Sequence, residues 1–204
     1  MRVSNVRRRG EPDRRAPCGR RGVNRVPSFP VFVLRHGETE WNRATRMQGH
    51  LDSALTTLGR VQAARQGAIV RRHASGIAAR VSPLGRARAS AAMAGLDATP
   101  DMRLAEIGMG KWQGLTRDEI PETGAGGLLW KFGAPGGEGM GEVIERLDAL
   151  LLDLSAPTIL VTHGLVGIVL RGRLLGIPPE GWDAMTDPQG VVHRIEDGRE
   201  TVLA

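Results

Sequence analysis

Two histidines of this 204-residue chain each stand at the end of a short apolar run and just before a glycine. The segment VFVLRHG, residues 31–37, carries Arg35 and His36, and the segment TILVTHG, residues 158–164, carries His163. Runs of this length are too short to cross a membrane and are typical of strands buried on both faces of a parallel sheet. Because imidazole can serve as nucleophile, acid or base, a histidine at each strand end is a candidate for chemistry.

Two arginines are expected beside these histidines. Arg35 ends the first strand, and Arg86 lies in the first turn of a helix that follows another predicted strand. The carboxyl ends of parallel strands share one edge of a sheet, so all four residues should meet in one crevice. Such a pocket suits a dianion such as a phosphate monoester, because each guanidinium fork can bind two phosphate oxygens.

Glu106 is the candidate general acid and base. It lies on the glycine-punctuated segment 104–114, which is expected to be a loop that passes close to the pocket. With neutral His36 as the nucleophile toward phosphorus, hydrolysis would divide into two easier displacements. Taken singly, a strand-end histidine is usually structural, and a lone arginine or glutamate is usually solvated, so the prediction depends on the whole set.

Strands and helices alternate along the chain, which predicts a three-layer α/β/α sandwich with a mostly parallel central sheet. Strands are predicted over 31–34, 77–82 and 158–162, and a hairpin over 191–203 that turns at Asp197-Gly198. Helices are predicted over 56–70 with Thr56 as its cap, over 83–94 with Ser82-Pro83 capping and opening it, over 141–154, and over 165–175.

Apolar spacing predicts which helix faces meet the sheet. For helix 56–70 the expected packing residues are Leu58, Val61, Ala64 and Ala68. For helix 141–154 they are Val143, Leu147, Leu150, Leu151 and Leu154. His50, His73 and His193 match no catalytic pattern and are interpreted as surface or packing residues.

The basic charge is concentrated in residues 1–28. This segment holds nine arginines against Glu11 and Asp13, a balance of +7, so the rest of a chain with net charge +6 carries −1. Its composition cannot support a core, which predicts a disordered Arg/Pro-rich extension before one domain over 29–204. The near-neutral, aromatic-poor body argues against a nucleic-acid partner, and the single cysteine, Cys18, favours the cytoplasm.

The stretch LRHGETEWN resembles the signature of the histidine phosphatase superfamily, also called phosphoglycerate mutase-like, and the resemblance runs from about Pro30 to the C-terminus. In that family the histidine of the Arg-His-Gly triplet is phosphorylated, which implies this role for His36. The stretch VSPLGRARAS places Arg86 on the second phosphate-binding arginine. RLAEIGMGKWQG places the acid on Glu106, and VTHG places the second pocket histidine on His163.

The same resemblance implies that no metal or cofactor is needed. It also puts further residues near the substrate, namely Asn42, Gln48, Gly49 and Gly164. The sequence departs from the family's common residues at Ser90, Ala105 and Gly139, none of which contacts phosphorus in the proposed scheme. These departures bear on substrate and rate more than on reaction type.

The leading expectation is a metal-independent phosphomonoester hydrolase of the phosphatase branch, acting on a small phosphorylated metabolite. A mutase-type phosphoryl transfer remains an alternative. It is disfavoured because the chain has no tyrosine and only Lys111 supplies a cation soon after Glu106. A catalytically poor phosphate-binding or signalling protein is a second alternative, which the presence of His36, Glu106 and His163 argues against.

Overall fold

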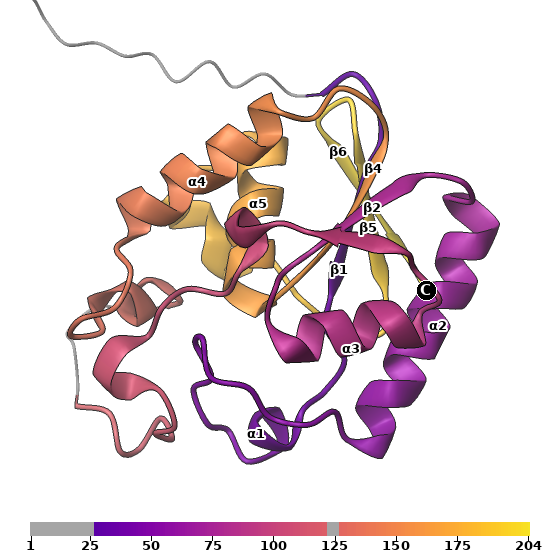
Figure 1. Ribbon diagram of the computed structural model, residues 1–204. Helices are drawn as coiled ribbons and strands as arrows, with labels where there is room; N and C mark the ends of the chain where they lie inside the picture. Colours follow the sequence, from indigo (N-terminus) through magenta and orange to yellow (C-terminus); the bar gives the residue numbers. More distant parts are fainter. Residues whose placement is uncertain (1–26, 122–126) are drawn as a thin grey trace, which may run out of the picture.

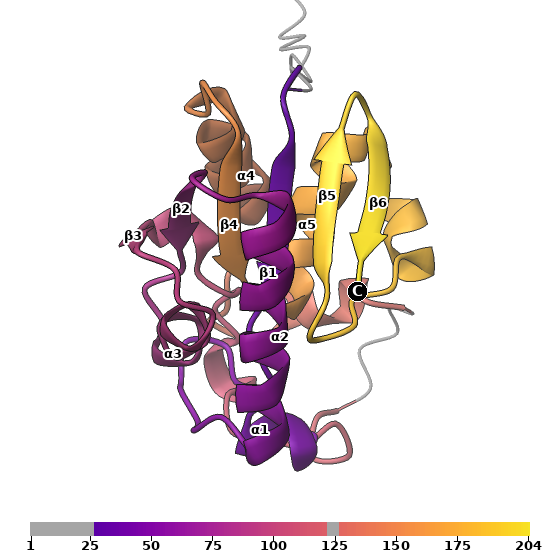
Figure 2. The ribbon, with the colours of Figure 1, turned by 90° about the vertical axis from the view of Figure 1, so that its right-hand side faces the viewer.

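Six strands form one mixed sheet in the computed structural model, which describes residues 27–121 and 127–204. The strand order is β3-β2-β4-β1-β5-β6, and the first four of these strands run parallel to one another. The hairpin β5–β6 joins the edge of β1 in antiparallel fashion (Figure 2). The strands are β1 (Val31–Arg35), β2 (Ala78–Val81), β3 (Ala98–Pro100), β4 (Thr158–Thr162), β5 (Val192–Glu196) and β6 (Arg199–Leu203).

Helices cover both faces of the sheet, which confirms the predicted three-layer α/β/α fold. Helices α2 and α3 lie on one face and α4 and α5 on the other, while α1 lies below the sheet with the long loops (Figures 1 and 2). Their bounds are α1 (Glu40–Arg43), α2 (Thr57–His73), α3 (Gly85–Met93), α4 (Met140–Leu152) and α5 (Gly164–Leu175). Short 3-10 helices are η1 (Met102–Leu104), η2 (Gly110–Trp112), η3 (Leu129–Gly133) and η4 (Pro179–Ala184).

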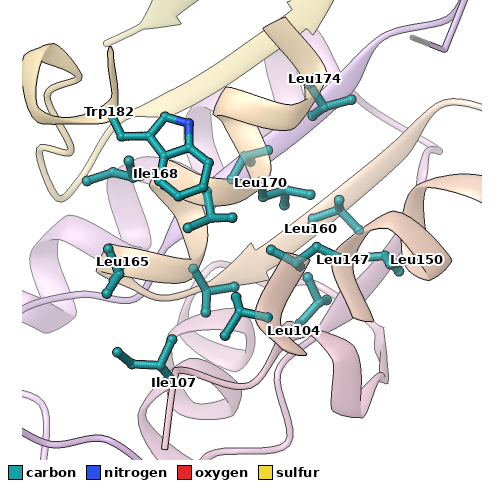
Figure 3. Close-up of a cluster of buried hydrophobic side chains, with 14 of the residues drawn as sticks. Leu104, Ile107, Leu147, Leu150, Leu160, Leu165, Ile168, Leu170, Leu174 and Trp182 are labelled. Carbon is teal, nitrogen blue, oxygen red and sulfur yellow. The ribbon is translucent and has the colours of Figure 1, made fainter. Parts of the chain in front are cut away.

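The central strands alternate between two hydrophobic clusters, as the two-residue period of a strand requires. Val31 and Val33 of β1 face the cluster under α4 and α5, whereas Phe32 and Leu34 face the cluster under α2 and α3. Figure 3 shows the first cluster, in which α4, α5 and the loop residues Leu104 and Ile107 pack together. The same hydrophobic cluster therefore packs against both the central strands and the loop that carries Glu106, which holds the two in a fixed relative position.

The predicted packing face of helix 56–70 is wrong. Leu58 and Val61 are 52% and 61% exposed, and Ala64 and Ala68 are exposed as well. The helix buries small residues and a few larger ones instead, namely Gly59, Ala63, Gln66, Gly67, Ile69 and Val70. The glycines allow backbones to touch, because a Cβ on Gly59 would lie 2.0 Å from the carbonyl oxygen of Glu38. The buried face of α2 is thus set by close contact between backbones, and the spacing of its apolar residues did not predict it.

Other boundaries follow the sequence closely. The predicted face of α4 is confirmed at Val143, Leu147 and Leu150, which are fully buried. Helix α3 begins at Gly85 with Leu84 as its N-cap, so the expectation that Ser82-Pro83 caps and opens it is wrong by two residues. The Ser82 hydroxyl instead faces the site described below.

The predicted extension over 1–28 and Cys18 fall almost entirely outside the described residues. Of the described residues, Phe29 packs against the first hydrophobic cluster, so the folded domain begins no later than Phe29. No helix over 27–121 or 127–204 is long and apolar enough to cross a membrane.

Candidate active site

The structure brings the predicted residues together at the carboxyl ends of β1, β2 and β4. They border a pocket of about 210 Å³, a size for a small ester. Predicted residues among its lining are Arg35, His36, Asn42, Gln48, Gly49, Arg86, Glu106 and Gly164. His163 is fully buried and does not line the pocket, but its ring centroid lies 5.2 Å from that of His36, which does.

Close backbone packing holds the His36 segment. The His36 amide donates to the Thr162 carbonyl oxygen at 3.0 Å, which ties the ends of β1 and β4. Next along the chain, a Cβ on Gly37 would lie 2.1 Å from the Gly59 carbonyl oxygen, so only glycine allows this contact with α2. The Gly37 amide also donates to the Ser90 hydroxyl at 3.0 Å, and that hydroxyl donates to the Arg86 carbonyl.

His36 has the geometry of a neutral nucleophile. Its Nδ1 lies 2.8 Å from the Gly37 carbonyl oxygen, so Nδ1 carries the proton and Nε2 keeps its lone pair. Arg86 Nε donates to this Nε2 at 3.3 Å. Burial, followed by the charges of Arg86 and Arg35, lowers the pKa of His36 well below its ordinary value of 6.5. The imidazole is therefore unprotonated at neutral pH and able to attack phosphorus.

Arg86 is held by backbone carbonyls and one carboxylate. Its Nη1 donates to the Leu51 carbonyl at 2.8 Å and to Asp52 at 3.0 Å, and its Nη2 donates to the Gly49 carbonyl at 2.8 Å. With Nε on His36, these bonds leave one N–H of Nη2 for a ligand oxygen. Arg86 is therefore buried and fixed at the pocket wall and is not a solvated side chain.

Arg35 is fixed by a largely buried carboxylate, that of Asp187. Its Nη1 lies 3.1 Å from Asp187 Oδ2 and donates to the Asp187 carbonyl at 2.8 Å. Asp187 also lies 3.8 Å from Arg171, and burial raises the pKa of its carboxyl. Arg35 Nε has no partner among the described residues, so it can donate to a phosphoryl oxygen.

Glu106 lies on the N-terminus of α5. Its carboxylate accepts from the backbone amides of Leu165 at 3.3 Å and Val166 at 3.1 Å, besides that of Ile107 at 3.1 Å. The residues around it, Leu104, Ile107 and Leu165, are buried in one cluster (Figure 3). The apolar packing and the helix amides together hold the carboxyl at the pocket wall.

His163 is prepared to act as a hydrogen-bond donor. Its Nε2 lies 2.6 Å from the Ser82 hydroxyl, whereas Nδ1 is buried without a partner among the described residues. When the Ser82 hydroxyl donates to Nε2, Nδ1 carries the proton. Burial, followed by the charges of His36 and Arg86, lowers the pKa of His163 well below 6.5, so the ring stays neutral.

The predicted substrate contacts lie on the segment after His36. Asn42 Oδ1 accepts from the amide and the hydroxyl of Thr39, both at 3.1 Å, which directs its amide nitrogen away from this capping contact. Gln48 is buried, and its Oε1 has no described partner. Gly49 has a φ of +53°, a conformation that glycine adopts without strain.

The sequence did not identify several supporting residues. Asp187 fixes Arg35, Gln189 donates to the His36 carbonyl at 3.0 Å, and Ser82 and Ser90 hold the rings and loops described above. Only Ser90 carried a signal, four residues after Arg86 on the same helix. The others depend on loops whose course the sequence pattern does not give.

The expectation that Lys111 is the cation available beside Glu106 is also wrong. Lys111 is exposed and does not line the pocket, while three cations that were not predicted do line it: Arg46, Arg117 and Lys131. Arg117 and Lys131 both lie over the Trp130 ring, at 4.4 Å and 5.9 Å from its centroid. Burial lowers the pKa of Lys131, partly offset by the charge of Glu106.

Within the described ranges, no group of three or more His, Cys, Asp or Glu residues gathers as a metal site. What is gathered is a neutral imidazole, two fixed arginines and a carboxyl at the edge of a mostly parallel sheet. These features define an enzyme of the phosphoryl-transfer class.

Comparisons with known proteins specify the family. Residues 31–202 match the model of the histidine phosphatase superfamily (branch 1), and the chain belongs to this family. It is 34% identical over 177 residues to the glucosyl-3-phosphoglycerate phosphatase of Mycobacterium tuberculosis, covering 76% of this chain and 79% of that protein. It is 35% identical over 164 residues to a probable phosphoglycerate mutase of Salmonella typhi, covering 72% and 75%.

A solved structure gives the same result. The phosphoglycerate mutase from Thermus thermophilus superposes with a TM-score of 0.69 at 30% identity, covering 86% of this chain and 99% of that one. The predicted family and phosphoglycerate mutase-like fold are therefore confirmed. The chain is therefore an enzyme of the histidine phosphatase superfamily, some of whose relatives are named phosphatases.

Proposed function

We propose that this enzyme hydrolyses the monoester of a small phosphorylated metabolite through a phosphohistidine at His36, without a metal ion. The observation that carries the proposal is the His36 ring itself, with Nδ1 on the Gly37 carbonyl and Nε2 toward the pocket. The protein contact of this Nε2 is a long one of 3.3 Å from Arg86 Nε, and Arg86 itself borders the pocket, so the lone pair faces the place where a phosphoryl group would bind. The same feature argues against a catalytically poor binding protein.

In the first displacement, the phosphoryl group is bound by Arg35, Arg86 and the Nδ1–H of His163. The Nε2 lone pair of His36 forms the N–P bond as the P–O bond to the alcohol breaks. Glu106 acts as the general acid that gives a proton to the departing alkoxide. In the second displacement, Glu106 takes a proton from water, the water oxygen bonds to phosphorus, and the N–P bond breaks.

We further propose that the alcohol part of the substrate carries a second anionic group. Arg117 and Lys131 support this, because both line the pocket and share one indole. No carboxylate of the described residues lies within 4.0 Å of either cation. The relatives named after phosphoglycerate compounds agree with such an ester, since glycerate carries a carboxylate.

Water, and not a second hydroxyl of the substrate, is the proposed acceptor. The absence of tyrosine from the chain supports this assignment. The expected scarcity of cations near Glu106 no longer argues against a mutase. The pocket cations described above would suit an intermediate with two phosphoryl groups. Mutase-type transfer therefore stays as the alternative that the experiment must address.

The direct test is a phosphate-release screen over sugar phosphates, phosphoglycerates and nucleotide-derived esters with a chelator present, run beside an assay that interconverts 2- and 3-phosphoglycerate. We expect phosphate release that the chelator does not reduce. Efficient interconversion with negligible phosphate release would establish the mutase alternative. Complete inhibition by the chelator would overturn the metal-free mechanism.

The remaining partner and location assignments stay predictions. The near-neutral net charge of residues 29–204 favours a small-molecule substrate over nucleic acid or a membrane surface. The single cysteine favours the cytoplasm, which fractionation of the native protein would test.

A further inference from the structure

His50 touches the backbone of the catalytic acid, although no motif marks it. Its Nε2 lies 2.9 Å from the carbonyl oxygen of Glu106, so this nitrogen donates when it carries the proton. His50 does not line the phosphoryl pocket but lines a neighbouring hollow formed by residues of the segment 102–113 and of the segment 136–146. Its ring therefore contacts the acid from behind, out of reach of the substrate.

The backbone around His50 is clamped by the phosphoryl-binding arginine. Arg86 donates to the carbonyl oxygens of Gly49 and Leu51, the two neighbours of His50. The His50 amide in turn donates to Gln113 Oε1 at 2.7 Å, which ties the segment to the far end of the acid's own loop. The backbone of residues 49–51 thus connects Arg86, which binds both neighbours of His50, with Glu106, whose carbonyl contacts the His50 ring.

The acid's loop needs such a support. Within the described residues, the Glu106 carboxyl is held by amides, while its peptide carbonyl has His50 as its hydrogen-bond partner. The loop continues through Gly108, whose backbone passes close to the His50 ring: a Cβ there would make an ordinary van der Waals contact of 3.6 Å with His50 Cε1. Glycine also leaves the backbone freer to move than other residues would.

We propose that His50 is a positioning residue that couples Arg86 to Glu106 and so fixes the distance between the acid and the leaving oxygen. This inference rests on the proposed function, in which Glu106 protonates the leaving group. An acid that is misplaced slows the departure of a basic alkoxide most and affects a good leaving group little. The loss should therefore depend on the leaving group, which a general weakening of the fold would not produce.

The test compares His50→Ala, His50→Gln and a matched control, His73→Ala, at an exposed histidine at the end of α2. We expect His50→Ala to lower kcat about tenfold for alkyl phosphates and much less for p-nitrophenyl phosphate, with inorganic phosphate binding little changed. His50→Gln, whose amide can donate from a similar position, should recover most of the loss. His73→Ala should match the unmodified enzyme.

Measuring the effect of His50→Ala on kcat in a Glu106→Gln enzyme distinguishes a positioning role from other roles. If His50 acts through the Glu106 carboxyl, His50→Ala should add little to Glu106→Gln. Equal losses for both kinds of substrate, or full additivity with Glu106→Gln, would overturn the inference. A Glu106→Gln enzyme with no leaving-group dependence would instead overturn the acid assignment itself.

Discussion

At the scale of single residues, the site depends on keeping two buried histidines neutral. The lowered pKa values of His36 and His163 arise from burial first and from neighbouring cations second. Neutral imidazole gives His36 its lone pair and still leaves His163 one N–H to donate. The same burial that keeps His36 and His163 neutral should therefore lower the free energy of unfolding at low pH.

This effect predicts a specific dependence of stability on pH. Between their lowered folded pKa values and the unfolded value near 6.5, the two histidines bind fewer protons folded than unfolded. The free energy of unfolding should then fall as pH drops below about 6.5, by up to ~1.4 kcal/mol per pH unit for each histidine. Denaturant unfolding at pH 7 and pH 5.5 measures this slope. An unchanged slope in His163→Asn would contradict the assignment.

A second residue-scale prediction uses the two lysines of the chain. Lys131 lines the pocket and Lys111 does not. 3-Phosphoglycerate and glycerol 3-phosphate differ by a carboxylate in place of a hydroxymethyl group. Lys131→Met should lower the preference in kcat/KM for the acidic ester by about tenfold, since a lost charged contact is worth about 1.5–3 kcal/mol. Lys111→Met should leave this ratio unchanged, and an equal ratio in all three enzymes would refute the second-anion proposal.

At the scale of elements, glycines decide how near α2 comes to the His36 segment. Gly59→Ala would place a Cβ 2.0 Å from the Glu38 carbonyl oxygen, so the helix and the loop must separate. We expect a loss of about 1–3 kcal/mol in the free energy of unfolding, as in other overpacked sites, together with reduced activity. The measurement is denaturant unfolding beside kcat.

The matched control is Gly141→Ala in α4, where a Cβ would meet no atom within 4 Å. Because alanine favours helix over glycine, this change should be neutral or stabilise by up to about 1 kcal/mol. If both substitutions had the same effect, the close contact at Gly59 would not be important for the fold.

The two glycines also show what the sequence could not give. The apolar pattern predicted α4 and its buried face, because that helix packs large side chains on the core. It failed for α2, because the contact there is made by small residues such as Gly59, while Leu58 and Val61 point outward. A hydrophobic pattern reports side-chain burial and does not report backbone contact.

At the scale of the whole molecule, the strand ends were predictable and the far wall of the pocket was not. Strand-end residues such as His36 and His163 meet because parallel strands share an edge. Lys131 lines the pocket from the 3-10 helix η3, and Asp187, which fixes Arg35, lies on a loop; the paths of both segments depend on tertiary packing. The sequence therefore placed His36 and Glu106, the proposed nucleophile and acid, in the pocket but did not find Lys131, the proposed contact of the alcohol part.

A whole-molecule prediction concerns the N-terminal segment. A chain that begins at Pro27 keeps the buried Pro27 and the core contact of Phe29 but loses nearly all of the arginine-rich segment. We expect this chain to fold with the same unfolding midpoint and the same kcat/KM, because residues 1–26 have a composition that cannot build a core. An insoluble or inactive product would show that the segment takes part in the domain.

The central claim is that phosphorus is transferred to Nε2 of His36, and rapid acid-free quenching during turnover of 32P-labelled p-nitrophenyl phosphate tests it most directly. We expect a covalent label that is stable in base, labile in acid, mapped by peptide mass spectrometry to residues 35–37, and absent from His36→Asn. Label that persists in His36→Asn, or that maps to another residue, would contradict the account.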